Sequence, residues 1–224
     1  MTSVEEFLSL MKKSPPGAVF NPWWQVDPEN DIGASAPRIR RQQLRAYFEQ
    51  RFDTARLVVV GEALGYRGGH FSGIPMTSER ILLEGIGGVS PKEILSRIAP
   101  RRTSNPGKFS RGFSEPTATI IWSTLLRLGL RSDEFVLWNA FPWHSFDPRR
   151  GLLSNRTPRP SERAAGLPVL KAFLDLFPCE RIVALGRIAG AELKELGVDA
   201  ACVRHPASGG AKLFREQIAQ LKIV

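Results

Sequence analysis

Cysteine is scarce in this chain of 224 residues, which contains only Cys179 and Cys202. Two thiols cannot ligate a four-cysteine zinc or iron–sulfur centre, and they provide no disulfide scaffold of the kind found in small secreted proteins. No run of residues is apolar for long enough to cross a bilayer. We therefore expect a protein that needs neither a bound cofactor nor a membrane.

Several catalytic motifs are also missing. The sequence has no GxxxxGK[ST] phosphate loop, no GxGxxG after its first apolar run, no GxSxG turn and no HExxH. These absences exclude P-loop nucleotide hydrolysis, standard dinucleotide binding and zinc-protease chemistry. The amino terminus carries Glu5 and Glu6 where an export signal would be basic, so we expect a cytoplasmic protein.

Acidic residues are outnumbered, because 22 Asp and Glu face 31 Lys and Arg, for a formal net charge of +9. A field of that sign favours polyanions such as nucleic acids. Aromatic residues lie among the basic ones, as expected where bases stack, although such runs are also typical of a solvated face. The basic stretches contain Arg38, Arg40, Arg41 and Arg45; Arg97, Arg101, Arg102, Lys108 and Arg111; and Arg149, Arg150, Arg156, Arg159 and Arg163.

Four short apolar runs predict buried parallel strands at Leu57–Gly61, Phe135–Asn139, Ile182–Gly186 and Ala201–Arg204. Helical patterns lie between and around them, at 4–13, 38–51, 79–86, 91–99, 116–129, 161–177, 187–196 and 211–222. This alternation predicts an α/β fold, a three-layer α/β/α sandwich with a central four-stranded parallel sheet. We expect a single domain over residues 1–224, with residues 1–50 as a helical arm packed on it.

Ligands of such a sheet bind beyond the carboxyl ends of its strands. Glu62 follows the first apolar run, Asn139 ends the second and His205 follows the last. Because these ends meet at one edge of the sheet, the three side chains are expected around one cleft. A three-histidine metal site with His70 and His144 would need ligands from three different strand ends, and we predict no metal.

The three side chains suit one reaction in particular. An Asn amide can read the edge of a base, and a neutral His can donate to an oxygen that gains negative charge. A carboxylate can orient water or offset the charge of an oxocarbenium-like sugar. Together they suit cleavage of an N-glycosidic bond. Each also has a structural alternative, as a strand-end cap, a loop amide or a turn histidine.

Five blocks resemble the uracil-DNA glycosylase superfamily, over roughly Leu57 to Phe214. GEALG, which begins at Gly61, resembles the GEAPG opening of the family-4 enzymes, and LWNAFP resembles their strand-end block with the asparagine that reads uracil. NRTPRPSE, ALGRIAG and HPASGG follow in the family order. The resemblance implies a monofunctional DNA repair enzyme that flips uracil out of DNA and hydrolyses its N-glycosidic bond to leave an abasic site.

The resemblance also assigns roles to matching residues. Asn139 would read the uracil edge, His205 would stabilise the charge that develops on the uracil oxygen O2, and Glu62 would orient water or offset the oxocarbenium. The uracil pocket would be formed by Gly61, Ala63, Leu64, Tyr66, Phe71, Met76 and Asn139. The implied partner is uracil-containing DNA, bound by a monomer through Arg156, Ser208, Gly209, Gly210 and Lys212.

The chain departs from the family-4 pattern at several points. Leu64 replaces the proline of GEAPG, and Met76 stands where the family has a phenylalanine that stacks on uracil. Phe71 or Met76 could fill that role. Gly209 and Gly210 stand where other members insert a leucine wedge. Family-4 enzymes also hold an iron–sulfur cluster on four cysteines, so the chain resembles an atypical, cluster-free branch.

These departures keep two alternatives open. The first is a glycosylase of the same fold that acts on another base, such as hypoxanthine, xanthine or mismatched thymine, and Tyr66 is one candidate for the residue that excludes thymine. The second is a catalytically silent protein that binds damaged or abasic DNA. The departures from the family pattern at Ala63, Leu64 and Met76 suggest this alternative.

Overall fold

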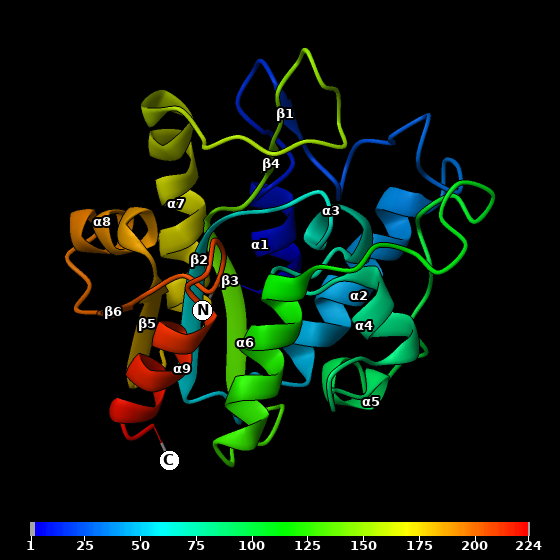
Figure 1. Ribbon diagram of the computed structural model, residues 1–224. Coiled ribbons are helices and arrows are strands. Elements are labelled where there is room, and N and C mark those ends of the chain that lie inside the picture. The colour runs from blue at the N-terminus through cyan, green and yellow to red at the C-terminus, as the bar shows by residue number, and fades with distance from the viewer. Residues whose placement is uncertain (1–2, 224) are drawn as a thin grey trace.

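The central sheet of the protein has four parallel strands. The computed structural model describes residues 3–223 and orders the strands as β3 (Phe135–Phe141), β2 (Leu57–Ala63), β5 (Arg181–Leu185) and β6 (Ala201–Val203). Helices cover both faces, with α6 and α9 in front of the sheet and α1 and α7 behind it (Figure 1). The predicted α/β fold with a four-stranded parallel sheet is therefore confirmed.

Every helix predicted from the sequence occurs, and the structure adds the short helix α3. The helices are α1 (Val4–Leu10), α2 (Ala36–Glu49), α3 (Gly69–Ser72), α4 (Glu79–Glu84), α5 (Pro91–Ile94), α6 (Pro116–Arg127), α7 (Pro160–Leu176), α8 (Arg187–Glu195) and α9 (Ala211–Gln220). Local signals define several of their beginnings. Ser78 and Ser90 cap α4 and α5 by accepting backbone N–H groups, and proline stands at the first position of α5, α6 and α7.

Helix α5 is much shorter than predicted, because it ends at Ile94 instead of continuing to Ala99. The buried guanidinium of Arg51 takes the carbonyl oxygens that a longer helix would use: Nη2 donates to Glu93 at 3.1 Å and Nη1 to Ile94 at 3.3 Å. A tertiary contact thus overrides the local helical pattern. The same side chain donates through Nε to the carbonyl of Phe135 at 3.0 Å, where β3 begins.

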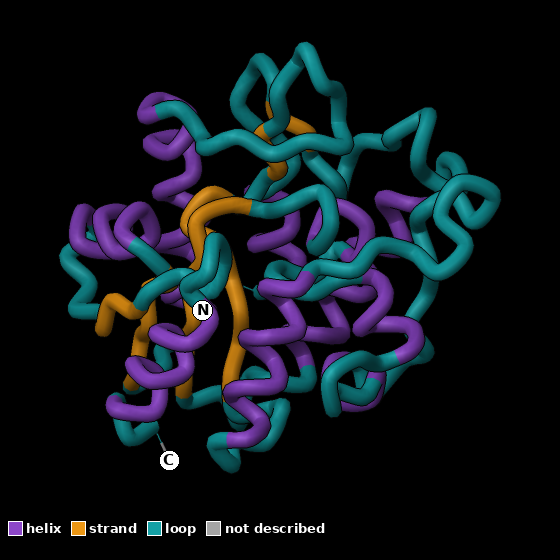
Figure 2. The backbone as a smooth tube through the Cα atoms, in the orientation of Figure 1, coloured by secondary structure: helices purple, strands orange, loops and turns teal. Residues whose placement is uncertain are grey.

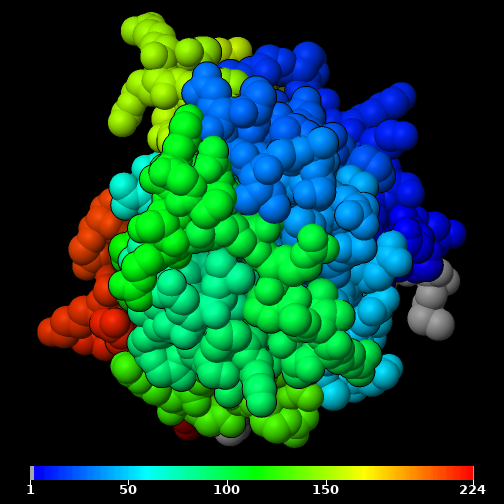
Figure 3. All heavy atoms as spheres, turned by 90° about the vertical axis from the view of Figure 1, so that its right-hand side faces the viewer, coloured from blue at the N-terminus to red at the C-terminus, as the bar shows by residue number. Residues whose placement is uncertain are grey.

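The segment before α2 pairs with the loop between β3 and α7, which the sequence did not predict. Strands β1 (Val19–Phe20) and β4 (His144–Ser145) form a small antiparallel sheet. In Figure 2 this sheet lies above the central one, and in Figure 3 the yellow-green tip of the second segment stands out beside the blue of the first. The front of the chain also enters the main core, since Phe7 of α1 packs edge-on against Trp138 of β3 with ring centroids 5.2 Å apart.

The two central strands set the register of the carboxyl edge. Gly61 of β2 lies opposite Asn139 of β3, and Ala63 lies opposite Phe141. Both strands continue two residues beyond their predicted ends, so Glu62 belongs to β2 itself. None of the helices within residues 3–223 combines the length and apolarity that a membrane span requires.

Candidate active site

A cavity of about 560 Å³ opens at the carboxyl end of the sheet. Its walls come from the end of β2, from β3, from the first turn of α6, and from the loops that precede α7 and follow β6. Glu62, Asn139 and His205 all line it. The structure therefore places the three residues predicted from the strand ends around one cavity.

The Asn139 amide is the most unusual group of this cavity. Its side chain is 1% exposed, yet neither Oδ1 nor Nδ2 has a hydrogen-bond partner within the described chain. Such a group carries a desolvation cost of about 1–3 kcal/mol, which a bound polar ligand would relieve. A Cβ built on Gly61 would lie 2.8 Å from Oδ1 and 3.1 Å from Met76 Sδ, so only glycine leaves room for this amide.

The His205 ring is held in one tautomer. Its Nδ1 accepts the backbone N–H of Ala207 at 3.1 Å, so the proton of the neutral ring is on Nε2. Burial, helped by the neighbouring charge of Arg204, lowers the pKa of His205 below its usual value. At neutral pH the cavity is therefore lined by an uncharged imidazole with an Nε2–H donor.

Two residues of the cavity have strained backbones. Met76 has φ 49° and Ser208 has φ 52°, in the left-handed region that non-glycine residues seldom adopt. This conformation costs roughly 1–2 kcal/mol per residue. Strain of this kind concentrates at functional sites, where the surrounding structure holds a side chain or backbone group in a required position.

The structure adds polar residues that the strand-end argument missed. Glu115, immediately before α6, and Asn155, before α7, both line the cavity. Asn155 Oδ1 accepts the backbone N–H of Tyr66 at 3.0 Å, which ties the α7 loop to the loop after β2. Burial raises the pKa of Glu115 to about 7, against the opposing charge of Arg67.

Some predicted pocket residues lie elsewhere. Gly61, Ala63, Leu64 and Met76 line the cavity, whereas Phe71 and Tyr66 do not. The fully buried Phe71 ring stacks on Phe113 with centroids 4.5 Å apart, so packing takes it away from the cavity. Of the two candidates for stacking on the base, Met76 is therefore the one at the cavity.

Of the residues predicted to contact DNA, some line the cavity and others lie outside it. Ser208 lines the cavity, while the Lys212 side chain is 90% exposed and faces Glu216. Gly210 is the residue before α9, where a Cβ would collide with the His205 carbonyl oxygen.

Arg156 lines the cavity, but its guanidinium is already engaged by Glu162. Nη1 and Nη2 each lie 2.7 Å from a Glu162 oxygen, and Nε donates to the Phe146 carbonyl. Its predicted DNA contact would have to be made in addition to these bonds.

His70 and His144 pair with each other away from this cavity. Their Nδ1 atoms lie 3.0 Å apart, and His144 Nε2 donates to the Ser154 carbonyl at 2.8 Å, so His144 Nδ1 accepts from His70. Burial lowers the pKa of His70 to about 3 and that of His144 to about 4. Hydrogen bonds thus account for His144, whereas His70 Nε2 is buried without a hydrogen-bond partner among residues 3–223 and lies 3.4 Å from an Asp27 carboxylate oxygen.

The two cysteines do not fit the cluster of the family-4 enzymes. Cys179 donates to the Ala55 carbonyl and Cys202 to that of Gly186, and four thiolates are needed. Within residues 3–223 no group of three or more His, Cys, Asp or Glu side chains is arranged to hold a metal ion.

Comparison with known proteins places the chain among relatives. The family model of the uracil DNA glycosylase superfamily matches residues 49–221, well over half of the chain. The crystal structure of wild-type Pedobacter heparinus SMUG2 is similar with a TM-score of 0.63 and 13% sequence identity, over 97% of this chain and 95% of that chain. At that identity the likeness is one of fold. Among curated proteins, no sequence matches this chain significantly.

Proposed function

The chain belongs to the uracil-DNA glycosylase superfamily, and we propose that it removes uracil from DNA by hydrolysing the bond between the base and deoxyribose. Membership of the family supports DNA glycosylase activity, and uracil as the preferred base is the proposed step. The observation that carries it is the Asn139 amide, which is buried in a cavity and has no hydrogen-bond partner in the part of the chain that the structure describes. An amide offers an acceptor and two donors, which complement the N3–H and carbonyl oxygen on the uracil edge.

Extrusion of the base comes first. A cavity at the strand ends cannot reach a base that is stacked in a duplex, so the nucleotide must rotate out of the helix. Asn139 would then bind the uracil edge, with Met76 against the base and the glycine at position 61 leaving space beside the amide.

His205 and Glu62 would act on the bond that breaks. As the bond from uracil N1 to sugar C1′ lengthens, its electron pair leaves with the base, and His205 Nε2–H donates to the O2 that gains charge. Glu62 offsets the positive charge on the sugar and orients a water molecule, whose oxygen bonds to C1′. The attacking water loses a proton to solvent, and the uracil anion takes up a proton from solvent. The products are free uracil and an abasic site.

The net charge of +9 supports DNA as the partner, since it favours phosphate binding at any sequence. Ser208, Gly209, Gly210 and Lys212, which lie between β6 and α9 or in the first turn of α9, would hold the backbone beside the extruded nucleotide.

A set of labelled oligonucleotides tests the proposal. Each carries U, T, hypoxanthine or xanthine at one position, is incubated with the protein in EDTA, and is then treated with alkali to cleave abasic sites. Strand breaks only at U support a uracil glycosylase. Breaks only at another base would replace uracil by that base, and tight binding without breaks would point to a silent damage-binding protein.

A further inference from the structure

One acidic side chain of the cavity has no part in these steps. Glu115 lies immediately before Pro116, the first residue of α6. Its half-buried carboxyl group packs against the loop after β2: a Cβ built on Gly68 would collide with Oε2, and one on Gly65 would lie 3.2 Å from Oε1. A side chain at position 68 would therefore force this flexible carboxyl group to shift. Glu115 thus forms part of the cavity wall, in contact with the loop after β2.

Among residues 3–223, no cation lies within ion-pair distance of the Glu115 carboxyl group. None of the ion pairs within residues 3–223 includes it. Arg67 favours its ionised form from the neighbouring loop, but that side chain is exposed and donates to the Tyr66 hydroxyl at 2.9 Å. Arg156, which lines the cavity, is held by Glu162. The half-buried Glu115 is therefore partly desolvated, and the exposed Arg67 opposes this effect without forming an ion pair that would supply a matching charge.

The remaining ionisable groups of the cavity do not supply that charge. Glu62 is acidic itself, and His205 is uncharged at neutral pH because burial lowers its pKa. Thr117, which also lines the cavity, is neutral. Burial consequently holds the pKa of Glu115 at about 7, so both of its forms are present near neutral pH.

The ionised and the protonated forms of Glu115 would have opposite effects on the binding of a nucleotide. The ionised form places a negative charge beside DNA phosphates and beside a base that leaves as an anion. The protonated form brings no charge and offers an O–H donor. We propose that Glu115 is a binding residue of the base cavity that works in its protonated form, donating to an acceptor oxygen of the extruded nucleotide, and that its ionisation weakens binding and cleavage. This inference rests on the proposed glycosylase function and names a further group of the same site.

A pH profile tests it. Because kcat/KM reports the free enzyme, its value for uracil-containing DNA should fall as the pH rises through the Glu115 pKa. We expect a roughly tenfold or greater decline from pH 6.5 to 8.5 in the wild type. In Glu115→Gln, whose amide is neutral at both values, this decline should be absent. Glu49→Gln, an exposed position at the end of α2, is the matched control and should decline like the wild type.

Two results would overturn the inference. The first is a Glu115→Gln profile that declines as in the wild type. The second is a folded Glu115→Gln protein that releases no uracil at pH 6.5, because this would show that the carboxylate is the working form.

A binding measurement separates this inference from the proposed function. The affinity for a duplex with a tetrahydrofuran abasic analogue is measured by fluorescence anisotropy at pH 6.5 and 8.5, at fixed salt. We expect the wild type to lose several-fold more affinity than Glu115→Gln. If this difference is seen without base release from any oligonucleotide, the glycosylase proposal fails and Glu115 keeps its binding role. If uracil is released but neither pH difference is seen, only the Glu115 inference fails.

Discussion

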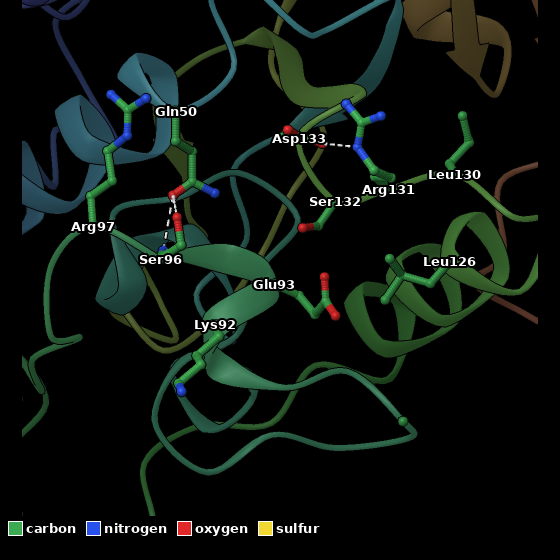
Figure 4. A pocket seen from close by; sticks show the side chains of 11 residues that line it. Gln50, Lys92, Glu93, Ser96, Arg97, Leu126, Leu130, Arg131, Ser132 and Asp133 are labelled. Atoms are coloured by element: carbon green, nitrogen blue, oxygen red, sulfur yellow. Dashed lines mark hydrogen bonds and ion pairs between the residues drawn. The ribbon is translucent and has the colours of Figure 1, made fainter.

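Two cavities, the one described above and a second one shown in Figure 4, lie at opposite ends of strand β3 and differ in how their polar groups are paired. The one at the amino end is the larger, about 640 Å³ against about 560 Å³. Several of its polar groups are paired: Gln50 Oε1 accepts from the Ser96 backbone N–H at 3.1 Å, and Arg131 Nε lies 3.1 Å from an Asp133 carboxylate oxygen (Figure 4). At the carboxyl end, both polar atoms of Asn139 are buried without partners.

The difference shows that volume does not identify a binding site here. At the amino end, hydrogen bonds and ion pairs hold the chain together, and a ligand would have to replace them. At the carboxyl end, an amide without partners among residues 3–223 and two strained backbones raise the energy of the empty site. Binding can recover that energy, which is the thermodynamic basis for placing the reaction there.

The largest expected effect tests this basis directly. Asn139→Ala and His205→Ala should each lower the single-turnover rate of uracil release by about 10²–10³-fold, since each removes a group that we propose contacts the base in the transition state. DNA affinity, measured by anisotropy on the abasic-analogue duplex, should stay near the wild-type value. Near wild-type rates in both variants would contradict the site assignment.

The free energy of unfolding provides a second test of whether Asn139 is a binding group or a structural one. Because the Asn139 amide makes no hydrogen bond with residues 3–223, Asn139→Ala should cost no more than about 1 kcal/mol of unfolding free energy, measured by urea titration. A much larger loss would show that the amide is a structural group.

Gly61→Ala should have the next largest effect on rate. The added methyl group would lie 2.8 Å from Asn139 Oδ1 and must displace the amide or Met76. A displacement of this kind in the base cavity is expected to lower kcat/KM by about ten- to a hundredfold. Gly197→Ala, where no atom lies within 4 Å of the added Cβ, has a positive φ of 71° and controls for loss of stability without change at the cavity. Equal rates for the two variants would remove the proposed role of the glycine.

Charge-reversal substitutions at the two ends of the sheet show which end binds DNA. Lys212→Glu, in the first turn of α9, should weaken binding about tenfold at 50 mM salt and reduce the salt dependence of the binding constant. Lys92→Glu, at the amino-end cavity of Figure 4, should bind DNA nearly as the wild type does. Anisotropy titrations from 50 to 200 mM salt measure both. A stronger effect at Lys92 would place the DNA at the wrong end of the sheet for the proposed reaction.

Gln50→Ala is expected to have the smallest effect on the reaction and a measurable one on stability. It removes the acceptor of the Ser96 N–H and hydroxyl, and should cost about 1 kcal/mol of unfolding free energy. Urea titration measures this loss. Uracil release at saturating DNA should be unchanged, and a rate loss beyond threefold would connect this cavity to the reaction.

The sheet and the three strand-end residues could be predicted from the sequence, because buried parallel strands are short continuous apolar runs and their carboxyl ends must meet. The positions of Asn139 and His205 at this edge could be predicted from the strand ends alone, without predicting the conformation of any loop. The absent partners of Asn139 and the tautomer of His205 could not be predicted, since both depend on atoms contributed by distant or tightly turned backbone.

Residues that loops position were either not predicted from the sequence or predicted in the wrong place. Glu115 carried one signal, as the first acid after Glu93 in a basic stretch, but nothing local places it against Gly68. Phe71 matched the expected type of stacking residue and was taken into the core by Phe113. Helix α5 ended early because of Arg51, which lies 42 positions before Glu93. Side-chain contacts over such sequence separations decide these positions, and a local pattern does not contain them.

The buried guanidinium of Arg51 has a consequence for how the molecule opens. Its hydrogen bonds join α2, α5 and the first residue of β3 through backbone carbonyls, and no carboxylate pairs with it among residues 3–223. Releasing β3 at this end would take the Phe135 carbonyl away from the buried guanidinium and leave one of its donors unsatisfied, so local opening should begin at the opposite end. We therefore expect the amide hydrogens of β3 to exchange slowly near Phe135 and faster toward Phe141, the end at which the proposed nucleotide site lies.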